Sequence, residues 1–347
     1  MTNDMKRKTI VAILCALLAA LFYALNVPFS KRLLTDVPPT AMAGLLYMGA
    51  GLGVGALFLT RGRSEGERLG RGDLPYVLGM IALDIAAPVL LMLGLKTASA
   101  AGASLMSSFE IVATSLIALA LFREPVSGRL WAAIGLITAA CALLSLEDFT
   151  GLSLSPGALL VLAATFCWGL ENNCTRRISD KNTYEIVTLK GLCCGAGSLL
   201  LGLVAGERLP ELSAVLKALL LGFVAYGLSI FLYIRAQDTL GAAKTSAYYA
   251  VAPFAGVALS FALFREPVSA HYLLALAIML VGSGLVVWDT LTLRHRHLHT
   301  HSITHTHDGS THTHVYAHAH AHDHFLNGAS HTHVHIAAEA HRLFDQG

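Results

Sequence analysis

Two carboxylates stand in the middle of long apolar runs of this sequence. Asp84 lies between Leu83 and Ile85, and Glu110 is flanked by apolar residues in the same way. An ionisable side chain at the centre of a bilayer costs about 2.5–3.5 kcal/mol, so such a residue is functional by default. A short turn joins the two runs, which places the carboxylates at a similar depth. A nearby pair of carboxylates holds a cation or a proton, so we expect both to belong to a polar pathway through the apolar region.

Other polar residues interrupt the apolar runs. Asn26 and Glu171 lie near the ends of two runs, and Lys244 lies early in another. We assign these three to the same pathway. A buried ion pair, such as Glu110 with Lys244, or snorkelling of the side chain near a span end is the alternative interpretation, and it applies to Lys190 as well. The sequence leaves the two interpretations open.

A third group of chemically active residues forms a His-rich tail. Of the 17 His, 16 lie between His295 and His341, mostly as His-x-His. Neutral imidazole binds Zn²⁺, Ni²⁺, Co²⁺ and Cu²⁺. The segment has few large apolar residues, so residues 291–347 are predicted to be a disordered tail. We expect it to bind Ni, Co or Zn. The predicted ligands are His295, His297, His299, His301, His305, His307, His312, His314, His318, His320, His322, His324, His331, His333 and His335.

The composition of the whole chain predicts a membrane protein. Of 347 residues, 55% are hydrophobic and only 13% are charged, against roughly 25% charged in soluble domains. The net charge of +2 is too small for a nucleic-acid binder. The six Cys form no CxxC pair and indicate no disulfide framework. No phosphate-binding loop or nucleophile–base group stands out, so the sequence predicts neither an enzyme nor a required cofactor.

The apolar runs are long enough for ten membrane-spanning helices. A span needs about 20 apolar residues. Lys and Arg are distributed 15 to 6 in favour of one side, which predicts a multi-pass protein of the bacterial inner membrane with both termini cytoplasmic. Pro88 and Pro253 are expected to kink the third and ninth spans. The spans are Thr9–Phe29, Thr40–Leu59, Leu74–Leu95, Ala98–Phe122, Arg129–Leu146, Pro156–Asn173, Tyr184–Val204, Leu212–Ile234, Leu240–Phe264 and Ala270–Asp289.

A seven-residue repeat divides the spans into two halves. Leu-Phe-Arg-Glu-Pro-Val-Ser occurs at 121–127 and again, letter for letter, at 263–269. Both copies end an apolar run, the fourth of one half and the fourth of the other. Five spans is an odd number, so the halves 9–148 and 156–290 must enter the membrane from opposite sides. The sequence therefore predicts an all-α protein built from two inverted repeats, a design typical of secondary transporters. The Arg-Glu-Pro turn is interpreted as structural, with Arg-Glu satisfying a neighbouring helix end.

Ten spans, five in each half, and a Phe-x-Glu-Pro turn after the fourth span of each half resemble the drug/metabolite transporter superfamily of the EamA type. The resemblance covers roughly residues 9–290. It implies export of amino acids, other metabolites or drugs through a central cavity lined by the first, third, fourth, sixth, eighth and ninth spans. The His-rich tail resembles that of nickel/cobalt-resistance permeases of the superfamily.

Two functional hypotheses follow from these features. The first is a gradient-driven exporter of divalent metal, Ni²⁺ or Co²⁺ and then Zn²⁺, with capture by the tail. The second is an exporter of a small organic solute such as an amino acid, in which the tail only buffers metal. The expected partners are membrane lipid and a small solute or metal ion, without nucleic acid, and a homodimer is left open.

Overall fold

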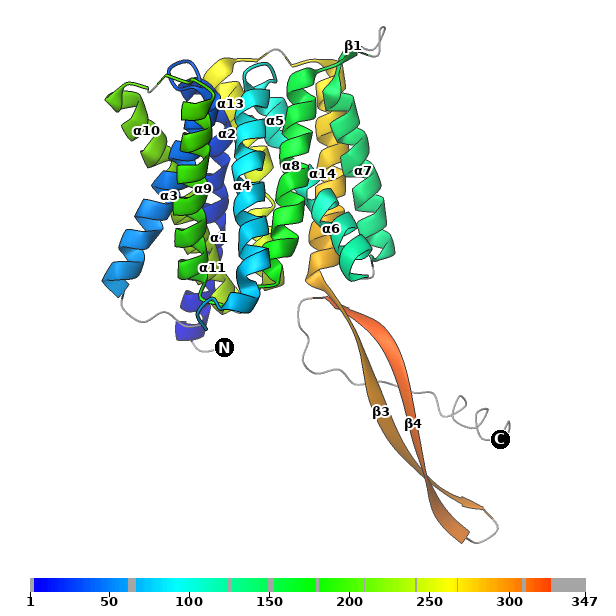
Figure 1. The fold of residues 1–347 in the computed structure, drawn as a ribbon. Helices are drawn as coiled ribbons and strands as arrows, with labels where there is room; N and C mark the ends of the chain where they lie inside the picture. The colour runs from blue at the N-terminus through cyan, green and yellow to red at the C-terminus, as the bar shows by residue number, and fades with distance from the viewer. Residues whose placement is uncertain are drawn as a thin grey trace. The chain divides into compact units, whose positions relative to one another are not determined.

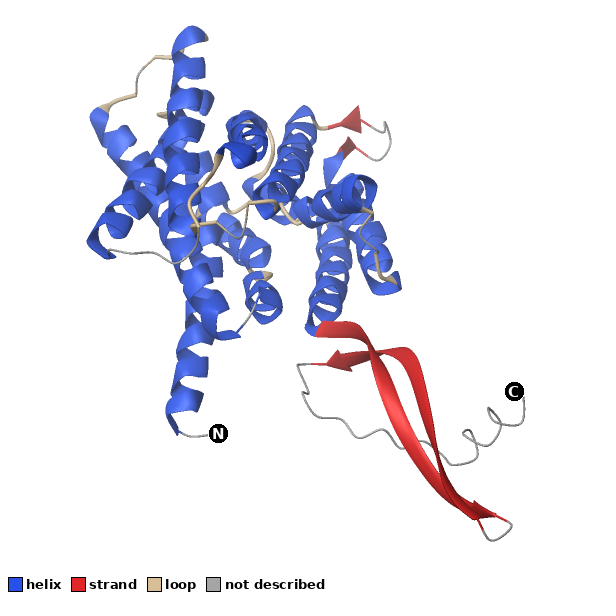
Figure 2. Cartoon of the chain, turned by 60° about the horizontal axis from the view of Figure 1, so that its bottom comes forward, coloured by secondary structure: helices blue, strands red, loops and turns tan. Residues whose placement is uncertain are grey.

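The computed structural model describes residues 3–61, 67–123, 126–148, 153–178, 181–208, 210–240, 242–266, 268–307 and 310–325. The chain divides into two compact units, Met1–Val287 and Trp288–Gly347. The first unit is a bundle of helices and the second contains a long β-hairpin (Figures 1 and 2).

The first half of the bundle holds seven α-helices and one 3₁₀ turn, η1. Their bounds are α1 Asn3–Ala24, α2 Asn26–Leu33, α3 Pro39–Arg61, η1 Arg71–Asp73, α4 Leu74–Leu95, α5 Ala100–Met106, α6 Phe109–Phe122 and α7 Gly128–Ser145. Two short antiparallel strands, β1 Leu146–Asp148 and β2 Ser153–Leu154, lead into the second half.

The second half holds seven further α-helices and one π-helical segment, η2. Their bounds are α8 Pro156–Arg176, α9 Thr183–Val204, α10 Leu212–Gly222, η2 Phe223–Leu228, α11 Ser229–Leu240, α12 Ala242–Tyr249, α13 Ala252–Phe264 and α14 Ala270–Leu291. Buried Met, Leu and Ala from both halves form one continuous hydrophobic core.

Nine helical segments of the described chain are long and apolar enough to cross a membrane. They correspond to nine of the ten predicted spans. The remaining prediction, Pro156–Asn173, falls on α8, a continuous helix of 21 residues that packs along α4 and α6. Its end carries Glu171, Asn172 and Asn173, and these three residues lower the hydropathy of α8 relative to the others.

Several of the spans are interrupted. One break at Leu25 separates α1 from α2, and another at Ser107 and Ser108 separates α5 from α6. A third separates α12 from α13, where Pro253 occupies the first turn of the new helix instead of kinking a continuous one. Pro88 lies inside α4, which remains one helix. Breaks of this kind free backbone groups to line a cavity.

Glycine permits the close approach of α3 to α9. A Cβ atom on Gly191 would lie 2.5 Å from the Cα atom of Gly51, a distance that real side chains do not reach. Small residues at such crossings let helix backbones touch, which is the main source of helix–helix attraction in a membrane. The α3–α9 contact is therefore fixed by Gly51 and Gly191.

Replacing Gly191 with Ala is expected to force α3 and α9 apart. Overpacking of this kind costs about 1–3 kcal/mol, which should lower the apparent melting temperature of the purified protein in detergent. Gly284→Ala is the matched control, because a Cβ atom on Gly284 meets nothing within 4 Å. Equal melting temperatures for the two variants would contradict this account of the crossing.

The two copies of the repeated motif share an uncommon backbone conformation. Arg123 and Arg265 both have positive φ, 54° and 50°, and each ends its helix in the left-handed region. Glu266 of the second copy accepts hydrogen bonds from the backbone N–H groups of Ala100 and Ala101 at 2.9 and 3.2 Å. It thus caps the first turn of α5. The structural interpretation of the motif is confirmed for this copy, whereas Glu124 of the first copy lies outside the described residues.

The second unit differs from the disordered tail that the sequence predicts. Strands β3 Thr292–His307 and β4 Ser310–Phe325 form an antiparallel hairpin (Figure 2). The alternation of His with Thr, Ala and Leu has a period of two, which is the period of a β-strand. The prediction of disorder rests on composition, and composition does not include the order of the residues that produces this alternation. The predicted ligands His331, His333 and His335 lie outside the described residues.

Candidate transport site

A cavity of about 290 Å³ lies among the helices of both halves. Its charged lining residues are Asp84, Glu110, Glu171 and Lys190. Five aromatic side chains form much of the remaining wall, namely Tyr23, Tyr47, Trp168, Tyr226 and Tyr249. Charges of both signs therefore meet aromatic rings in one cavity.

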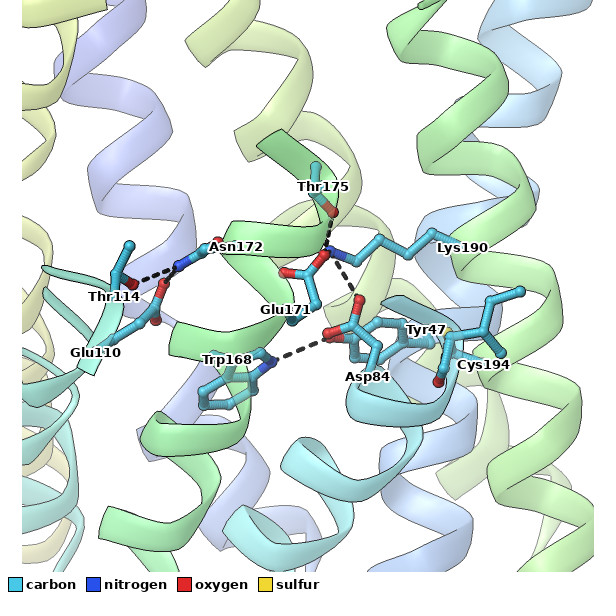
Figure 3. Close-up of polar contacts among 11 residues, drawn as sticks. Tyr47, Asp84, Glu110, Thr114, Trp168, Glu171, Asn172, Thr175, Lys190 and Cys194 are labelled. Atoms are coloured by element: carbon cyan, nitrogen blue, oxygen red, sulfur yellow. Dashed lines mark hydrogen bonds and ion pairs between the residues drawn. The ribbon is translucent and has the colours of Figure 1, made fainter. Parts of the chain in front are cut away.

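Three charged side chains form a compact cluster on one side of the cavity (Figure 3). The Nζ atom of Lys190 on α9 lies 2.7 Å from Oδ2 of Asp84 on α4 and 2.9 Å from Oε1 of Glu171 on α8. The hydroxyl of Thr175, one turn after Glu171, donates to the same Oε1. Asp84 is 0% exposed and Glu171 is 2% exposed. When all three groups are ionised, the cluster carries a net charge of −1.

Hydrogen bonds extend the cluster to an aromatic wall. The hydroxyl of Tyr47 donates to Oδ1 of Asp84 at 2.9 Å, and the indole N–H of Trp168 donates to the Tyr47 oxygen at 3.4 Å. The Tyr47 ring lies 5.4 Å from that of Tyr226. A buried charge must be paired or hydrogen-bonded, and here Tyr47 donates a hydrogen bond to Oδ1 of Asp84 while the ion pair with Lys190 compensates Oδ2.

In Figure 3, Glu110 lies to the left of helix α8, whereas Lys190 and Asp84 lie to its right. Glu110 belongs to the first turn of α6, directly after the break between α5 and α6. Its Oε1 atom accepts a 2.7 Å hydrogen bond from the amide of Asn172, which also donates to the hydroxyl of Thr114 at 3.2 Å. Among the described side chains, no cation lies within ion-pair distance of Glu110. Its carboxylate therefore stands in the cavity with a neutral partner.

Asn26 joins the first and eighth spans beside the cavity. Its amide donates to the Tyr226 hydroxyl at 2.8 Å and accepts a hydrogen bond from Ser30 at 3.1 Å. Asn26 follows the break at Leu25, and Tyr226 lies in η2. Irregular turns in helices are frequent at functional sites. This contact therefore links the irregular segments of two spans.

The structure brings together most of the residues that the sequence assigns to the pathway. Asp84, Glu110 and Glu171 line one cavity, and Asn26 contacts it through Tyr226. The carboxylates of Asp84 and Glu110 do not form a direct pair, since each has its own partners. The side chain of Lys244 lies outside what the structure describes.

The ion pair of Lys190 with Asp84 agrees with the alternative interpretation of Lys190 as a structural residue. Lys190 also lines the cavity. Sequence reasoning did not identify the aromatic wall. The signal available was the presence of Tyr or Trp inside otherwise aliphatic spans. Within the described part of the chain, no group of three or more His, Cys, Asp or Glu is placed to hold a metal ion.

Comparisons with known proteins agree with this architecture. The EamA-like transporter family model matches residues 10–146 and again 155–288. An uncharacterised transporter of Methanothermobacter thermautotrophicus is 26% identical over 296 residues, which cover 78% of this chain and 84% of that one. The uncharacterised transporter YyaM of Bacillus subtilis is 23% identical over 256 residues, covering 71% and 83%.

One solved crystal structure has the same fold. It superposes with a TM-score of 0.58 at 20% identity and covers 80% of this chain and 97% of its own. The family model matches well over half of the sequence, in two successive segments that together contain every described residue of the cavity. The chain belongs to the EamA-like transporter family, and it is a multi-pass membrane transporter.

Proposed function

We propose that this transporter exports a small organic solute that carries an amino group, such as an amino acid, through the central cavity. The observation that carries the proposal is the combination of aromatic walls with charges of both signs. A cavity near 300 Å³ is at the small end of ligand sites, which suits a solute of amino-acid size. This composition supports the organic solute over a bare metal ion.

The individual contacts suggest how such a solute is held. Glu110 offers its carboxylate to an ammonium group, and the rings of Tyr23 and Tyr249 provide aromatic faces for the same cation. Lys190 offers an ammonium to a solute carboxylate at the other side of the cavity. A divalent metal would have to displace Lys190 from its place between Asp84 and Glu171. Binding of the organic solute requires no such displacement of Lys190.

We further propose that ten spans form two inverted halves, with α8 as the sixth span. The packing supports this arrangement, because α4 lies along α8 just as α11 lies along α1. These two pairs join the third span to the sixth and the eighth to the first. The double match to the family model and the shared conformation of Arg123 and Arg265 point the same way.

Transport is proposed to alternate between two gates on either side of the cavity. The contact of Asn26 with Tyr226 joins the first and eighth spans. The cluster of Lys190, Asp84 and Glu171 joins the seventh, third and sixth spans. The negative charge of that cluster suits coupling to an inward flow of protons, with both termini cytoplasmic in a bacterial inner membrane. A homodimer remains compatible with this scheme.

The test is counterflow in proteoliposomes that contain the purified full chain. A panel of labelled amino acids, the corresponding deaminated acids and simple amines identifies the solute. The proposal expects exchange of at least one amino compound and little exchange of its deaminated analogue. Exchange that is indifferent to the amino group would reject it.

Export of Ni²⁺, Co²⁺ or Zn²⁺ is a second candidate, favoured by one observation. The register of the hairpin sets His opposite His at four positions, which are 295 with 322, 297 with 320, 299 with 318 and 305 with 312. Cross-strand neighbours lie about 4.5–5.5 Å apart at Cβ, a spacing at which two imidazoles can share one ion. In this version the tail gathers metal for the transporter.

Removal of residues 292–347 separates the two candidates. We compare three strains, which express the full chain, the shortened chain or no transporter. Their tolerance to Ni²⁺, Co²⁺ and Zn²⁺ and their cellular content of each metal are measured. Metal export requires that the full chain lower metal content and that the shortened chain do so less. Unchanged metal content in all three strains, with solute exchange retained by the shortened chain, would eliminate the metal candidate.

A further inference from the structure

A second cavity lies outside the transport site, between α2 and the segment formed by α10 and η2. Its volume is about 490 Å³ and its wall is mainly apolar, with Phe29 and Leu33 on one side and Leu220 and Val224 on the other. Leu220 and Phe29 are exposed side chains of membrane-spanning segments. The cavity is therefore a groove that faces the lipid.

Charge is confined to one end of this groove. Arg32 is at the end of α2 and Lys217 is in the second turn of α10, and both line the groove together with Asp36. Among the described residues, neither cation has a carboxylate within ion-pair distance. The charged end carries two positive charges and one negative charge, so it attracts an anion.

The two helices give the groove a polar-to-apolar axis. On α2, Arg32 lies seven residues after Leu25, and on α10 and η2, Lys217 lies seven residues before Val224. Seven residues are two helical turns, so each pair lies on one face and about 10 Å apart. The helices run in opposite directions, which sets both basic residues at one end (Figure 1).

We propose that this groove binds one anionic phospholipid. The phosphate lies between Arg32 and Lys217, and an acyl chain lies along Phe29, Leu33, Leu220 and Val224. Basic side chains attract anionic lipid headgroups at a membrane surface, and an acyl chain is the apolar ligand that a bilayer supplies. The wall of the groove includes Val224 and Leu25, whose neighbours Tyr226 and Asn26 form the contact beside the transport cavity. The bound lipid therefore packs against the gate of the first and eighth spans.

Native mass spectrometry of the purified full chain tests the proposal. The protein is titrated with phosphatidylglycerol and phosphatidylcholine of identical acyl chains. Two basic residues predict a preference for phosphatidylglycerol of about 30-fold. The variant Arg32→Gln with Lys217→Gln should lose that preference. The matched control is Lys96→Gln with Arg208→Gln, which removes the same charge from two exposed positions outside the groove and should retain it.

A second variant, Leu220→Trp, fills the groove without changing its charge and should reduce retention of both lipids. Equal retention of the two lipids by the parent would overturn the proposal, and so would a preference that survives in the Arg32/Lys217 variant. Displacement of the lipid by a transported amino acid would show a solute entrance instead. A dimer in place of the lipid adduct would show an interface between copies. The lipid preference of the parent and its loss in the Arg32/Lys217 variant do not depend on which solute the transporter carries.

Discussion

Replacing Lys190 with Met is expected to stop transport and to destabilise the bundle. The change leaves Asp84 and Glu171 buried without the cation that both contact. Breaking a buried ion pair by removing one partner costs about 3–5 kcal/mol, because the remaining charge is uncompensated. Thermal unfolding of the purified variant in detergent measures this loss, and counterflow in proteoliposomes measures transport.

The origin of that loss can be isolated with a neutral cluster. Combining Lys190→Met with Asp84→Asn and Glu171→Gln removes all three charges, and it should recover most of the thermal stability while transport stays absent. Lys181→Met is the matched control, because Lys181 lies outside the cavity and pairs at 2.8 Å with Glu67, whose side chain is 80% exposed, and an ion pair with a solvent-exposed partner contributes little. If Lys190→Met melts like the parent, the cluster does not hold the helices together.

The spans of this fold could be predicted because membrane helices require long apolar runs. Nine predicted spans coincide with helical segments apolar enough to cross a membrane. The tenth, on α8, falls short because Glu171 and Asn172 bring polar side chains to the cavity. Hydropathy is therefore weaker evidence for a membrane span when polar residues of the candidate site lie in that span.

The breaks within the spans could be predicted only in part. The sequence marks Pro253, but α12 ends before it, and nothing in the residue types marks the gap at Ser107 and Ser108 or the π-helical turn of η2. Such irregularities are stabilised by tertiary contacts, among them the hydrogen bond of Asn26 with Tyr226. A one-dimensional pattern does not contain these contacts.

The free-energy cost of burying charge in a membrane singles out the candidate site residues in the sequence, but it does not predict which of them pair. Asp84 and Glu110 are conspicuous because charge is expensive in a membrane. Whether two charges meet depends on helix faces, and these spans are apolar all round. The repeat holds further information, since its copies lie 142 residues apart and this offset takes Asp84 to Tyr226. Both residues contact Tyr47, one by a hydrogen bond and one ring to ring.

Replacing Glu110 with Gln is expected to abolish recognition of the amino group while leaving the fold intact. The new side chain keeps the shape of Glu110 and can still accept a hydrogen bond from Asn172. Loss of one partner in a buried charge contact costs about 2–5 kcal/mol, which is a fall of about 30- to 4,000-fold in transport efficiency. Initial rates in proteoliposomes at several solute concentrations measure this fall.

A comparison of two solutes assigns the effect to the ammonium contact. In the parent protein, an amino compound should be exchanged far better than its deaminated analogue. In Glu110→Gln, the two should be exchanged equally, because the carboxylate that distinguishes them is gone. Glu211→Gln, at an exposed carboxylate outside the cavity, should keep the parent's preference. Equal losses for both solutes in Glu110→Gln would instead assign Glu110 to proton coupling or to the movement of α6, since either role acts on every solute alike.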